Sequence, residues 1–300
     1  MPVAPQFNDI IQMMRAMPSV ADLPIETIRQ TPVPVNPSPT PVDAVTNRDI
    51  QGPAGKIPIR IYRSGKSGNL PLVLFMHGGG FVVGGLDTHD EMARVITAET
   101  GCVTVSVDYR LAPENPFPAA PDDCFAALKW ASANGRELGA DPARLAVVGD
   151  SAGGNLAAVM ALRTRDEKGP AIKGQVLIYP GVDMGSSFPP APDGQYYIIT
   201  PKDKDFYNRS YFKDPKDLRN PLASPILAES HKGLPAALVI TAEYDPLCAQ
   251  GEAYAQKLKQ AGVAVTQTRY AGAVHGFMSF PVPMAKQGLD EVAGWLNARL

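Results

Sequence analysis

A serine set among small residues is the first feature of the sequence that could do chemistry. Residues 149–153, GDSAG, have the form G-x-S-x-G, in which the serine occupies a sharp turn between a strand and a helix. An apolar run, 144–150, precedes this serine, and an alanine-rich run, 152–167, follows it. Because a serine hydroxyl is a weak nucleophile until a base takes its proton, Ser151 as a nucleophile requires a histidine and an acidic residue from elsewhere in the chain.

Four histidines are available as the base, and their order along the chain narrows the choice. Folds with this serine turn place the acidic residue and then the histidine after the nucleophile, which leaves His231 and His275. His231 lies in a polar stretch, AESHKGLPA, that we expect to be solvated surface. His275 follows the last apolar run among small residues, with Gly276 beside it. We therefore predict that His275 is the base.

Two acidic residues, Glu243 and Asp245, lie on the loop after the apolar run 236–242. A carboxylate in this role fixes the tautomer of the histidine and stabilises the imidazolium that forms during the reaction. Asp245 lies deeper in the turn and precedes Pro246, whose ring stiffens the loop backbone. We therefore predict Asp245 rather than Glu243 as the partner of the base. For either residue, the alternative is an ordinary charge on a surface loop.

A glycine-rich stretch, LFMHGGGFVVGG at 74–85, is either a plain loop or a place where backbone N–H groups face a ligand. Glycine costs about 0.5–1 kcal/mol relative to alanine inside regular structure, whereas losing one N–H donor aimed at a reacting oxygen costs about 3–4 kcal/mol. In folds of this type one donor follows the nucleophile, here Ala152, and another comes from the loop after the third strand, where HGGG lies. A G-x-G-x-x-G phosphate fingerprint fails because Val83 stands where its last glycine would be.

Strands and helices alternate from residue 45 onward. Two short strands around the turn GPAGK predict a hairpin, and continuous apolar runs follow at 70–76, 102–109, 144–150, 175–180, 236–242 and 263–270. Runs that are apolar on both faces are typical of a parallel sheet covered by helices on both sides. Helices are predicted near 88–100, 121–134, 152–167, 249–262 and 284–299. The pattern predicts an α/β fold with an open sheet of about eight strands.

Two segments outside this alternation predict a helical lid over the carboxyl edge of the sheet, where ligands bind in open α/β folds. More than fifty residues separate the apolar run at 175–180 from the run at 236–242, and this interval contains the predicted insertion 183–230. Within the insertion, Thr200-Pro201-Lys202-Asp203 resembles a helix N-terminus. Near the chain start, Ile10, Met13, Met14 and Met17 have helical spacing and require a surface to pack on, ahead of a proline-rich connector at 31–42. The predicted divisions are a cap segment with its connector at 1–44, the first part of the core at 45–182, a cap insertion at 183–230 and the second part of the core at 231–300.

Composition argues against several classes of partner. The net charge of −2 and the isoelectric point near 6.1 provide no basic surface for nucleic acid or an anionic membrane. The sequence has no apolar run long enough to span a bilayer, and its start lacks the pattern of a signal peptide. The three cysteines include no CxxC pair, which disfavours a zinc site or a disulfide framework and fits a reducing compartment. We therefore expect a cytoplasmic globular protein without a metal site.

Five motifs in register resemble those of a known family. HGGGF, DYRLAPENPFPAA, GDSAGGN, YDPL and HGF closely resemble the hormone-sensitive-lipase-like branch of the α/β-hydrolases, the bacterial family IV carboxylesterases. The resemblance implies the α/β-hydrolase fold, with an eight-stranded, mostly parallel sheet, helices on both faces, a helical cap and no cofactor. It places the catalytic triad and the oxyanion-hole donors on Ser151, Asp245 and His275, and on Gly79, Gly80 and Ala152.

The function that the resemblance implies is hydrolysis of short-to-medium-chain carboxylic esters through an acyl-enzyme on the serine. The partner is then a small-molecule ester substrate, and a homodimer is a further expectation. An amidase or a lactonase on the same site is the nearest alternative, and a non-catalytic receptor, as in the gibberellin receptors that have lost the catalytic histidine, is a second. His77 and the YRLAPE run are expected to have structural rather than catalytic roles. Many family members continue DPL with an arginine and an acidic residue, whereas Cys248, Ala249 and Gln250 follow here, and we expect Cys248 to be an inert neighbour.

Overall fold

The fold is built on an eight-stranded sheet with the strand order β1-β2-β4-β3-β5-β6-β7-β8. The computed structural model describes residues 2–30 and 38–300, so the predicted connector at 31–42 lies outside the described residues up to residue 37. The strands are β1 (Ala44–Gly52), β2 (Gly55–Arg63), β3 (Leu70–Met76), β4 (Val103–Val107), β5 (Ala140–Asp150), β6 (Gly174–Ile178), β7 (Ala236–Tyr244) and β8 (Val265–Val274). Strands β1 and β2 form the predicted antiparallel hairpin, β2 is antiparallel to β4, and the remaining neighbours are parallel. The predicted eight-stranded, mostly parallel α/β sheet is confirmed.

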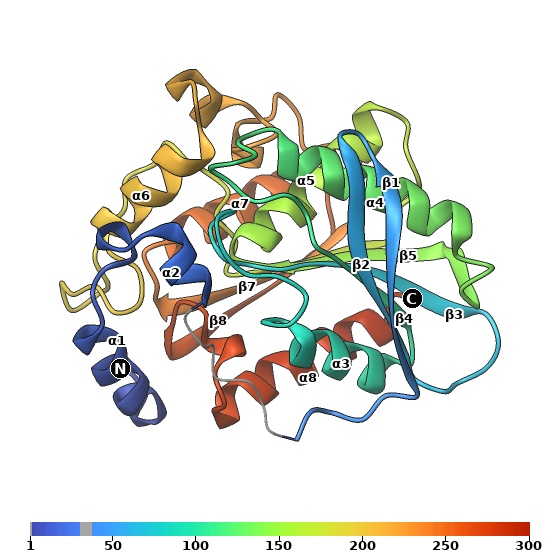
Figure 1. Cartoon of the computed structure of the whole chain (residues 1–300), viewed down its shortest axis with the longest axis horizontal. Coiled ribbons are helices and arrows are strands. Elements are labelled where there is room, and N and C mark those ends of the chain that lie inside the picture. Colours follow the sequence, from blue (N-terminus) through green and yellow to red (C-terminus); the bar gives the residue numbers. More distant parts are fainter. Residues whose placement is uncertain (1, 31–37) are drawn as a thin grey trace.

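Helices cover both faces of this sheet (Figure 1). They are α1 (Asn8–Ala16), α2 (Ile25–Gln30), α3 (Asp90–Thr100), α4 (Ala119–Asn134), α5 (Ala152–Asp166), α6 (Pro201–Tyr211), α7 (Cys248–Gln260) and α8 (Pro283–Asn297). Short 3₁₀ turns lie at Pro5–Phe7, Val20–Asp22, Pro215–Arg219, Pro225–Leu227 and Phe277–Ser279. The helices predicted near 88–100, 121–134, 152–167, 249–262 and 284–299 correspond to α3, α4, α5, α7 and α8 within a few residues.

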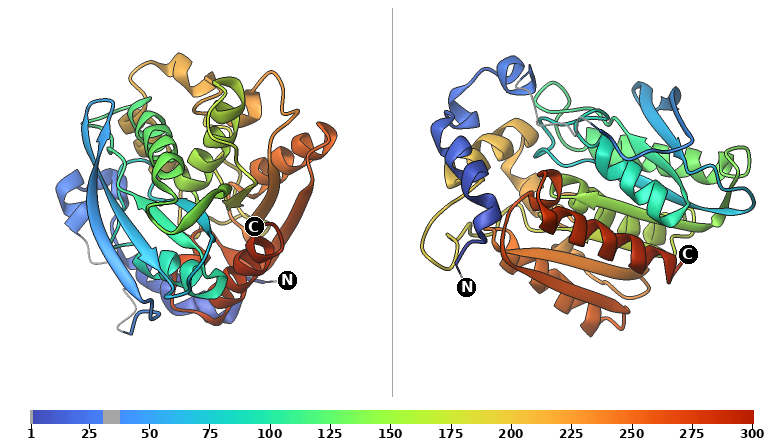
Figure 2. Two further views of the ribbon diagram at one scale, coloured as in Figure 1. Left: turned by 90° about the vertical axis from the view of Figure 1, so that its right-hand side faces the viewer. Right: turned by 90° about the horizontal axis from the view of Figure 1, so that it is seen from below.

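Alternating side chains of the central strands feed two separate hydrophobic cores. In β3, Leu72 and Leu74 belong to the core under α4, α5 and α7, whereas Val73 and Phe75 belong to the core under α3 and α8. Successive side chains of a strand point to opposite faces of a sheet, so a strand buried on both faces must be apolar at every position. That requirement explains the continuous apolar runs in the sequence. Figure 2 shows the same layers from two further directions.

Three helices that lie outside the layered core gather at one end of the sheet: α1, α2 and α6 (Figures 1 and 2). Helix α6 begins at the predicted cap, where Thr200 accepts a hydrogen bond from the Asp203 amide and the Asp203 carboxylate accepts one from the Thr200 amide. The same carboxylate accepts a hydrogen bond from Ser19 Oγ at 2.6 Å, and Lys202 pairs with Asp22. The N-terminal segment is therefore tied to α6 by polar contacts.

The predicted packing face of the N-terminal helix is partly wrong. Met13 and Met17 are 45% and 39% exposed, and the buried side chains are Phe7 and Ile11, with Ile10 and Met14 half-buried. The predicted set (10, 13, 14, 17) and the observed set (7, 10, 11, 14) both have the i, i+3, i+4, i+7 spacing, so spacing alone does not decide which set is buried. Phe7 and Ile11 join the core under α3 and α8, and Met13 and Met17 are left exposed. Met17 also lies beyond the last helical residue, in extended backbone.

No helix within the two described ranges combines the length and apolar character that crossing a bilayer would require.

Candidate active site

The three residues predicted as a triad each come directly after a parallel strand. Ser151 follows β5, Asp245 follows β7, and His275 follows β8. Because the carboxyl ends of parallel strands meet at one edge of the sheet, the topology brings together side chains that are far apart in sequence. Ser151 Oγ lies 2.9 Å from His275 Nε2, and His275 Nδ1 lies 2.7 Å from Asp245 Oδ2. Both distances are in hydrogen-bond range.

Ser151 occupies the strained turn that its sequence pattern predicts. Its φ of +52° is in the left-handed region, which costs a non-glycine residue about 1–2 kcal/mol. The turn is held from outside, because the Ser151 amide donates to the Ile178 carbonyl of β6 at 2.8 Å. Small residues are required on either side: a Cβ on Gly153 would lie 1.9 Å from the Met76 carbonyl oxygen. This close approach allows α5 to begin directly behind the serine.

Asp245 is the carboxylate that reaches the histidine, and Glu243 is not. Glu243 accepts a hydrogen bond from the Gly272 amide at 2.7 Å instead. Asp245 is 5% exposed, and its other carboxylate oxygen accepts a hydrogen bond from the Leu247 amide at 2.8 Å. The backbone of Cys248 also donates to the Asp245 carbonyl at 2.9 Å, so two backbone N–H groups hold the loop.

The thiol of Cys248 is not set up for reactivity. Burial, with a smaller contribution from the nearby Glu252 carboxylate, raises the pKa of this thiol to about 11. Since the thiolate is the reactive form of cysteine, Cys248 stays protonated and inert at neutral pH, in line with the expectation from the sequence.

His231 is not solvated surface, contrary to the expectation. It is 6% exposed, its Nε2 lies 2.9 Å from the Pro225 carbonyl oxygen, and its ring packs edge-on against Tyr254. Burial lowers the pKa of His231. The polar residues around it in the sequence are exposed, but its own side chain turns inward. His231 is therefore a packing residue and no alternative base.

His77 lies under the glycine-rich loop rather than beside the nucleophile. It is fully buried, its ring stacks on Tyr109 with 4.2 Å between centroids, and the Tyr109 hydroxyl donates to the His77 carbonyl at 2.8 Å. Burial lowers the pKa of His77 to about 3, so the imidazole is neutral and its Nδ1 can donate to the Gly78 carbonyl, 2.7 Å away. These contacts connect the YRLAPE run to the glycine loop.

The glycine loop and the start of α5 both carry N–H groups without a partner among the described residues. Gly79 and Gly80 have φ values of +118° and +60°, and no residue in the described part of the chain accepts a hydrogen bond from their amides or from that of Ala152. The Ala152 amide is the first of α5, where N–H groups have no partner within the helix. The amides of Gly79, Gly80 and Ala152 are thus three backbone donors without an acceptor in the described part of the chain.

Helix α6 packs directly onto this loop. A Cβ on Gly80 would lie 2.4 Å from Cδ1 of Tyr207, so the tyrosine ring occupies the space that a side chain would need. One residue further on, the ring of Phe81 stacks on Tyr211 with 3.9 Å between centroids. Burial raises the pKa of Tyr207 to about 12, so its phenol stays neutral. Sequence reasoning did not single out these two tyrosines for a role at the loop.

A second imidazole–carboxylate pair supports the loop from behind. The Gly78 amide donates to Asp150 Oδ1 at 2.9 Å, and His89 Nε2 lies 3.2 Å from the same oxygen. A Cβ on Gly78 would lie 2.5 Å from the Asp150 carboxylate. Asp150 is buried, and although burial raises the pKa of its carboxyl, the neighbouring His89 and the hydrogen bond from the Gly78 amide hold that pKa below its ordinary value. An ionised carboxylate next to the nucleophile therefore anchors the first glycine.

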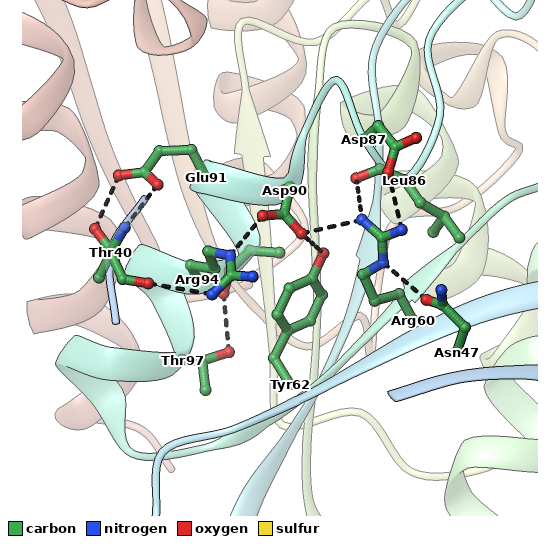
Figure 3. Close-up of polar contacts among 11 residues, drawn as sticks. Thr40, Asn47, Arg60, Tyr62, Leu86, Asp87, Asp90, Glu91, Arg94 and Thr97 are labelled. Carbon is green, nitrogen blue, oxygen red and sulfur yellow. Dashed lines mark hydrogen bonds and ion pairs between the residues drawn. The ribbon is translucent and has the colours of Figure 1, made fainter. Parts of the chain in front are cut away.

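A polar network surrounds Asp90 at the start of α3, the residue that follows His89 (Figure 3). Asp90, the first residue of the helix, accepts hydrogen bonds from Tyr62 at 2.8 Å and from Arg60 at 3.1 Å, and it pairs with Arg94. These contacts join β2 to α3 and fix the helix end that carries His89. A cavity of about 760 Å³ is lined by Asp90 and Arg94 of this network and by His89, but by none of the triad residues. It therefore lies beside the residues that support the glycine loop and does not reach Ser151.

Across residues 2–30 and 38–300, histidine, cysteine, aspartate and glutamate side chains form no group of three or more that could hold a metal ion.

Comparisons with known proteins show the family to which the chain belongs. A family model described as the alpha/beta hydrolase fold matches residues 73–279. The carboxylic ester hydrolase LipN of Mycobacterium tuberculosis is 44% identical over 243 residues, which cover 78% of this chain but only 64% of that protein, less than two thirds of its length. An arylesterase of Saccharolobus solfataricus is 43% identical over 228 residues, covering 75% of this chain and 74% of that protein. A hyperthermophilic esterase from the archaeon Pyrobaculum calidifontis superposes with a TM-score of 0.92 at 39% identity, covering 99% of both chains.

Proposed function

Because the chain belongs to the hormone-sensitive-lipase-like branch of the alpha/beta-hydrolase family and is a carboxylic ester hydrolase, we propose that Ser151, His275 and Asp245 are its catalytic triad and that it hydrolyses esters through an acyl-enzyme. The observation that carries the proposal is the continuous line of hydrogen bonds from Ser151 Oγ through the His275 ring to Asp245, with distances of 2.9 and 2.7 Å.

The proposed reaction has two halves that use the same imidazole. His275 Nε2 takes the proton of Ser151 as the hydroxyl oxygen attacks the ester carbonyl, and the imidazolium then donates that proton to the departing alcohol. Water attacks the acyl-enzyme in the second half, with the same nitrogen as base and then as acid. Asp245 holds the N–H of Nδ1 and stabilises the imidazolium at each stage.

The negative oxygen of each tetrahedral intermediate is proposed to bind the amides of Gly79, Gly80 and Ala152. Support comes from their free N–H groups and from the left-handed backbone at the two glycines. Donors that are in place before the reaction lose no energy in reorganising, and each contributes about 3–4 kcal/mol to stabilisation of the transition state.

Residues 2–30 and 183–230 are proposed to form a cap that closes the substrate site. Helices α1, α2 and α6 lie together at one end of the sheet, and α6 contacts the glycine loop through Tyr207. A folded cap of this kind favours short-to-medium acyl chains over long triglycerides. A homodimer and a cytoplasmic location remain proposals that rest on the sequence alone.

The test is hydrolysis of nitrophenyl esters of increasing acyl length by the parent protein and by Ser151→Ala. The parent is expected to prefer short and medium chains, and Ser151→Ala is expected to lose turnover at every length. Ser230→Ala, which alters an exposed serine, is the matched control and should behave like the parent. Equal activity of Ser151→Ala and the parent would refute the proposal. A matched set of nitroanilides in the same assay distinguishes an amidase.

A further inference from the structure

One arginine of the N-terminal segment contacts the backbone beside the glycine loop. Arg29, in α2, donates from Nε to the Val82 carbonyl at 2.9 Å and from Nη2 to the Ala112 carbonyl at 2.9 Å. Its guanidinium also forms two hydrogen bonds with the Glu114 carboxylate, at 3.0 and 2.8 Å. A planar guanidinium with donors on three nitrogens can satisfy two carbonyls and a carboxylate at once, which a lysine ammonium cannot do in the same geometry.

Both carbonyls belong to backbone that is bonded to the glycine loop itself. The amides of Val82 and Val83 donate to the Gly79 carbonyl at 3.1 and 3.0 Å, and the Ala112 amide donates to the Phe81 carbonyl at 2.9 Å. Arg29 therefore joins the two chain segments that hold the loop on either side of Gly80. A displacement of Val82 or Ala112 is transmitted to Gly79 and Phe81 through one hydrogen bond each.

The loop needs such outside support because Phe81, a non-glycine residue, has a strained backbone. Gly79, Gly80 and Phe81 have successive φ values of +118°, +60° and +63°. A non-glycine residue such as Phe81 remains in the left-handed region only where the surroundings determine it. The stacking of Phe81 on Tyr211 is one such restraint, and the Arg29 contacts are a second, independent one.

We infer that Arg29 is a positioning residue for the oxyanion hole, acting through the Val82 and Ala112 carbonyls on the amides of Gly79 and Gly80. The inference rests on the proposed function, since it assumes that those amides bind the reacting oxygen. Within the described residues the hydrogen bonds of Arg29 go to Val82, Ala112 and Glu114 and not to the triad, so its loss is expected to weaken transition-state stabilisation rather than substrate binding.

The experiment compares Arg29→Ala and Arg29→Lys with the full-length parent on a nitrophenyl ester, well below each unfolding temperature. Loss of a whole oxyanion donor costs about 10²–10³-fold in kcat, so donors that are displaced but present should cost about 10–100-fold. The KM is expected to change by less than about threefold. Arg29→Lys, which can keep one carbonyl contact, should fall between Arg29→Ala and the parent. Affinity for a trifluoromethyl ketone, which binds as a tetrahedral oxyanion, should fall in parallel with kcat/KM.

Two control variants separate positioning from general loosening of the segment. Arg15→Ala removes the exposed contact between α1 and Gln195 and should leave kcat within twofold of the parent. Glu114→Gln removes the ion pair but leaves the two carbonyl contacts of Arg29, so it should cost much less than Arg29→Ala. If Arg29→Ala fails to fold, the same comparison is made with Arg29→Lys, whose kcat must still fall below that of Glu114→Gln.

The inference is overturned if kcat of the folded Arg29 variants equals that of the parent, or if Arg15→Ala loses as much as Arg29→Ala. It is also overturned if the loss appears in KM alone with kcat unchanged. Each of these results leaves the proposed function intact provided that Ser151→Ala is inactive. Undiminished activity of Ser151→Ala refutes the proposed function itself, whatever the Arg29 variants do.

Discussion

Gly80→Ala is the substitution whose effect follows most directly from the structure. A Cβ at this position would lie 2.4 Å from Cδ1 and 2.7 Å from Cε1 of Tyr207, whereas ordinary contacts begin near 3.4 Å. Either the loop or α6 must therefore move by about 1 Å to admit the methyl group. The backbone adds to the cost, because φ at this residue is +60° and an L-residue pays about 1–2 kcal/mol in the left-handed region.

The expected result is a loss of about 100-fold in kcat with a nitrophenyl ester, because a misplacement of about 1 Å at a catalytic site costs on that order. The unfolding free energy should fall by about 2–5 kcal/mol, of which about 1–2 kcal/mol comes from the backbone and about 1–3 kcal/mol from overpacking against Tyr207. Gly262→Ala is the matched control, since that glycine has φ of +81° and no atom within 4 Å of an added Cβ. It should lose only the backbone part of that stability, about 1–2 kcal/mol, and keep its kcat.

A double variant tests whether the tyrosine ring causes the effect. Tyr207→Ala removes the atoms that the new methyl group meets, so Gly80→Ala should cost far less in the Tyr207→Ala background than in the parent. The four kcat values form a cycle whose interaction term isolates the collision. Parent-like turnover of Gly80→Ala, or a loss that is the same in both backgrounds, would refute the reasoning.

Three further predictions concern other parts of the site. Asp245→Asn should keep its fold by circular dichroism but lose about 10⁴-fold in kcat, because the His275 tautomer is no longer fixed; a loss under tenfold would contradict this. Since the pKa of His77 is lowered to about 3 in the folded state, the unfolded state binds a proton that the native state does not between about pH 3 and 6.5. Stability to urea should therefore rise with pH in that window, by up to ~1.4 kcal/mol per unit from this residue. His77→Gln, which keeps a donor for the Gly78 carbonyl, should lack that contribution, and an unchanged slope would count against it. Because the thiol pKa of Cys248 is raised to about 11, iodoacetamide at pH 7 should not alkylate this residue, and the treated protein should keep its activity. Rapid alkylation of Cys248 would contradict its assignment as inert.

Much of the fold follows from local patterns, because the requirement that produces each pattern is itself local. A strand buried on both faces must be apolar throughout. The run at 70–76 coincides with β3, and the run at 236–242 covers all but the last two residues of β7. The triad could be predicted for a related reason. Each of its members directly follows a strand, and the order of the strands determines which loops meet at the edge of the sheet.

The contacts that support the site could not be predicted in the same way, because they join residues with no common local pattern. Arg29 meets Val82 and Ala112 across more than fifty positions of sequence, and Tyr207 reaches Gly80 from a separate helix. His231 has polar neighbours that suggested a surface position, yet its ring packs against Tyr254. Asp150 was visible within GDSAG, but its bond to the Gly78 amide depends on the close approach of the two loops.

Covalent labelling of the nucleophile tests the central claim most directly. A nitrophenyl alkylphosphonate should inactivate the parent in proportion to one adduct per chain, and peptide mass spectrometry should place that adduct on Ser151. His275→Ala should react far more slowly, because nothing then takes the serine proton. An adduct on another residue that abolishes activity while Ser151 stays unmodified would contradict the account, as would full activity in protein that is modified at Ser151.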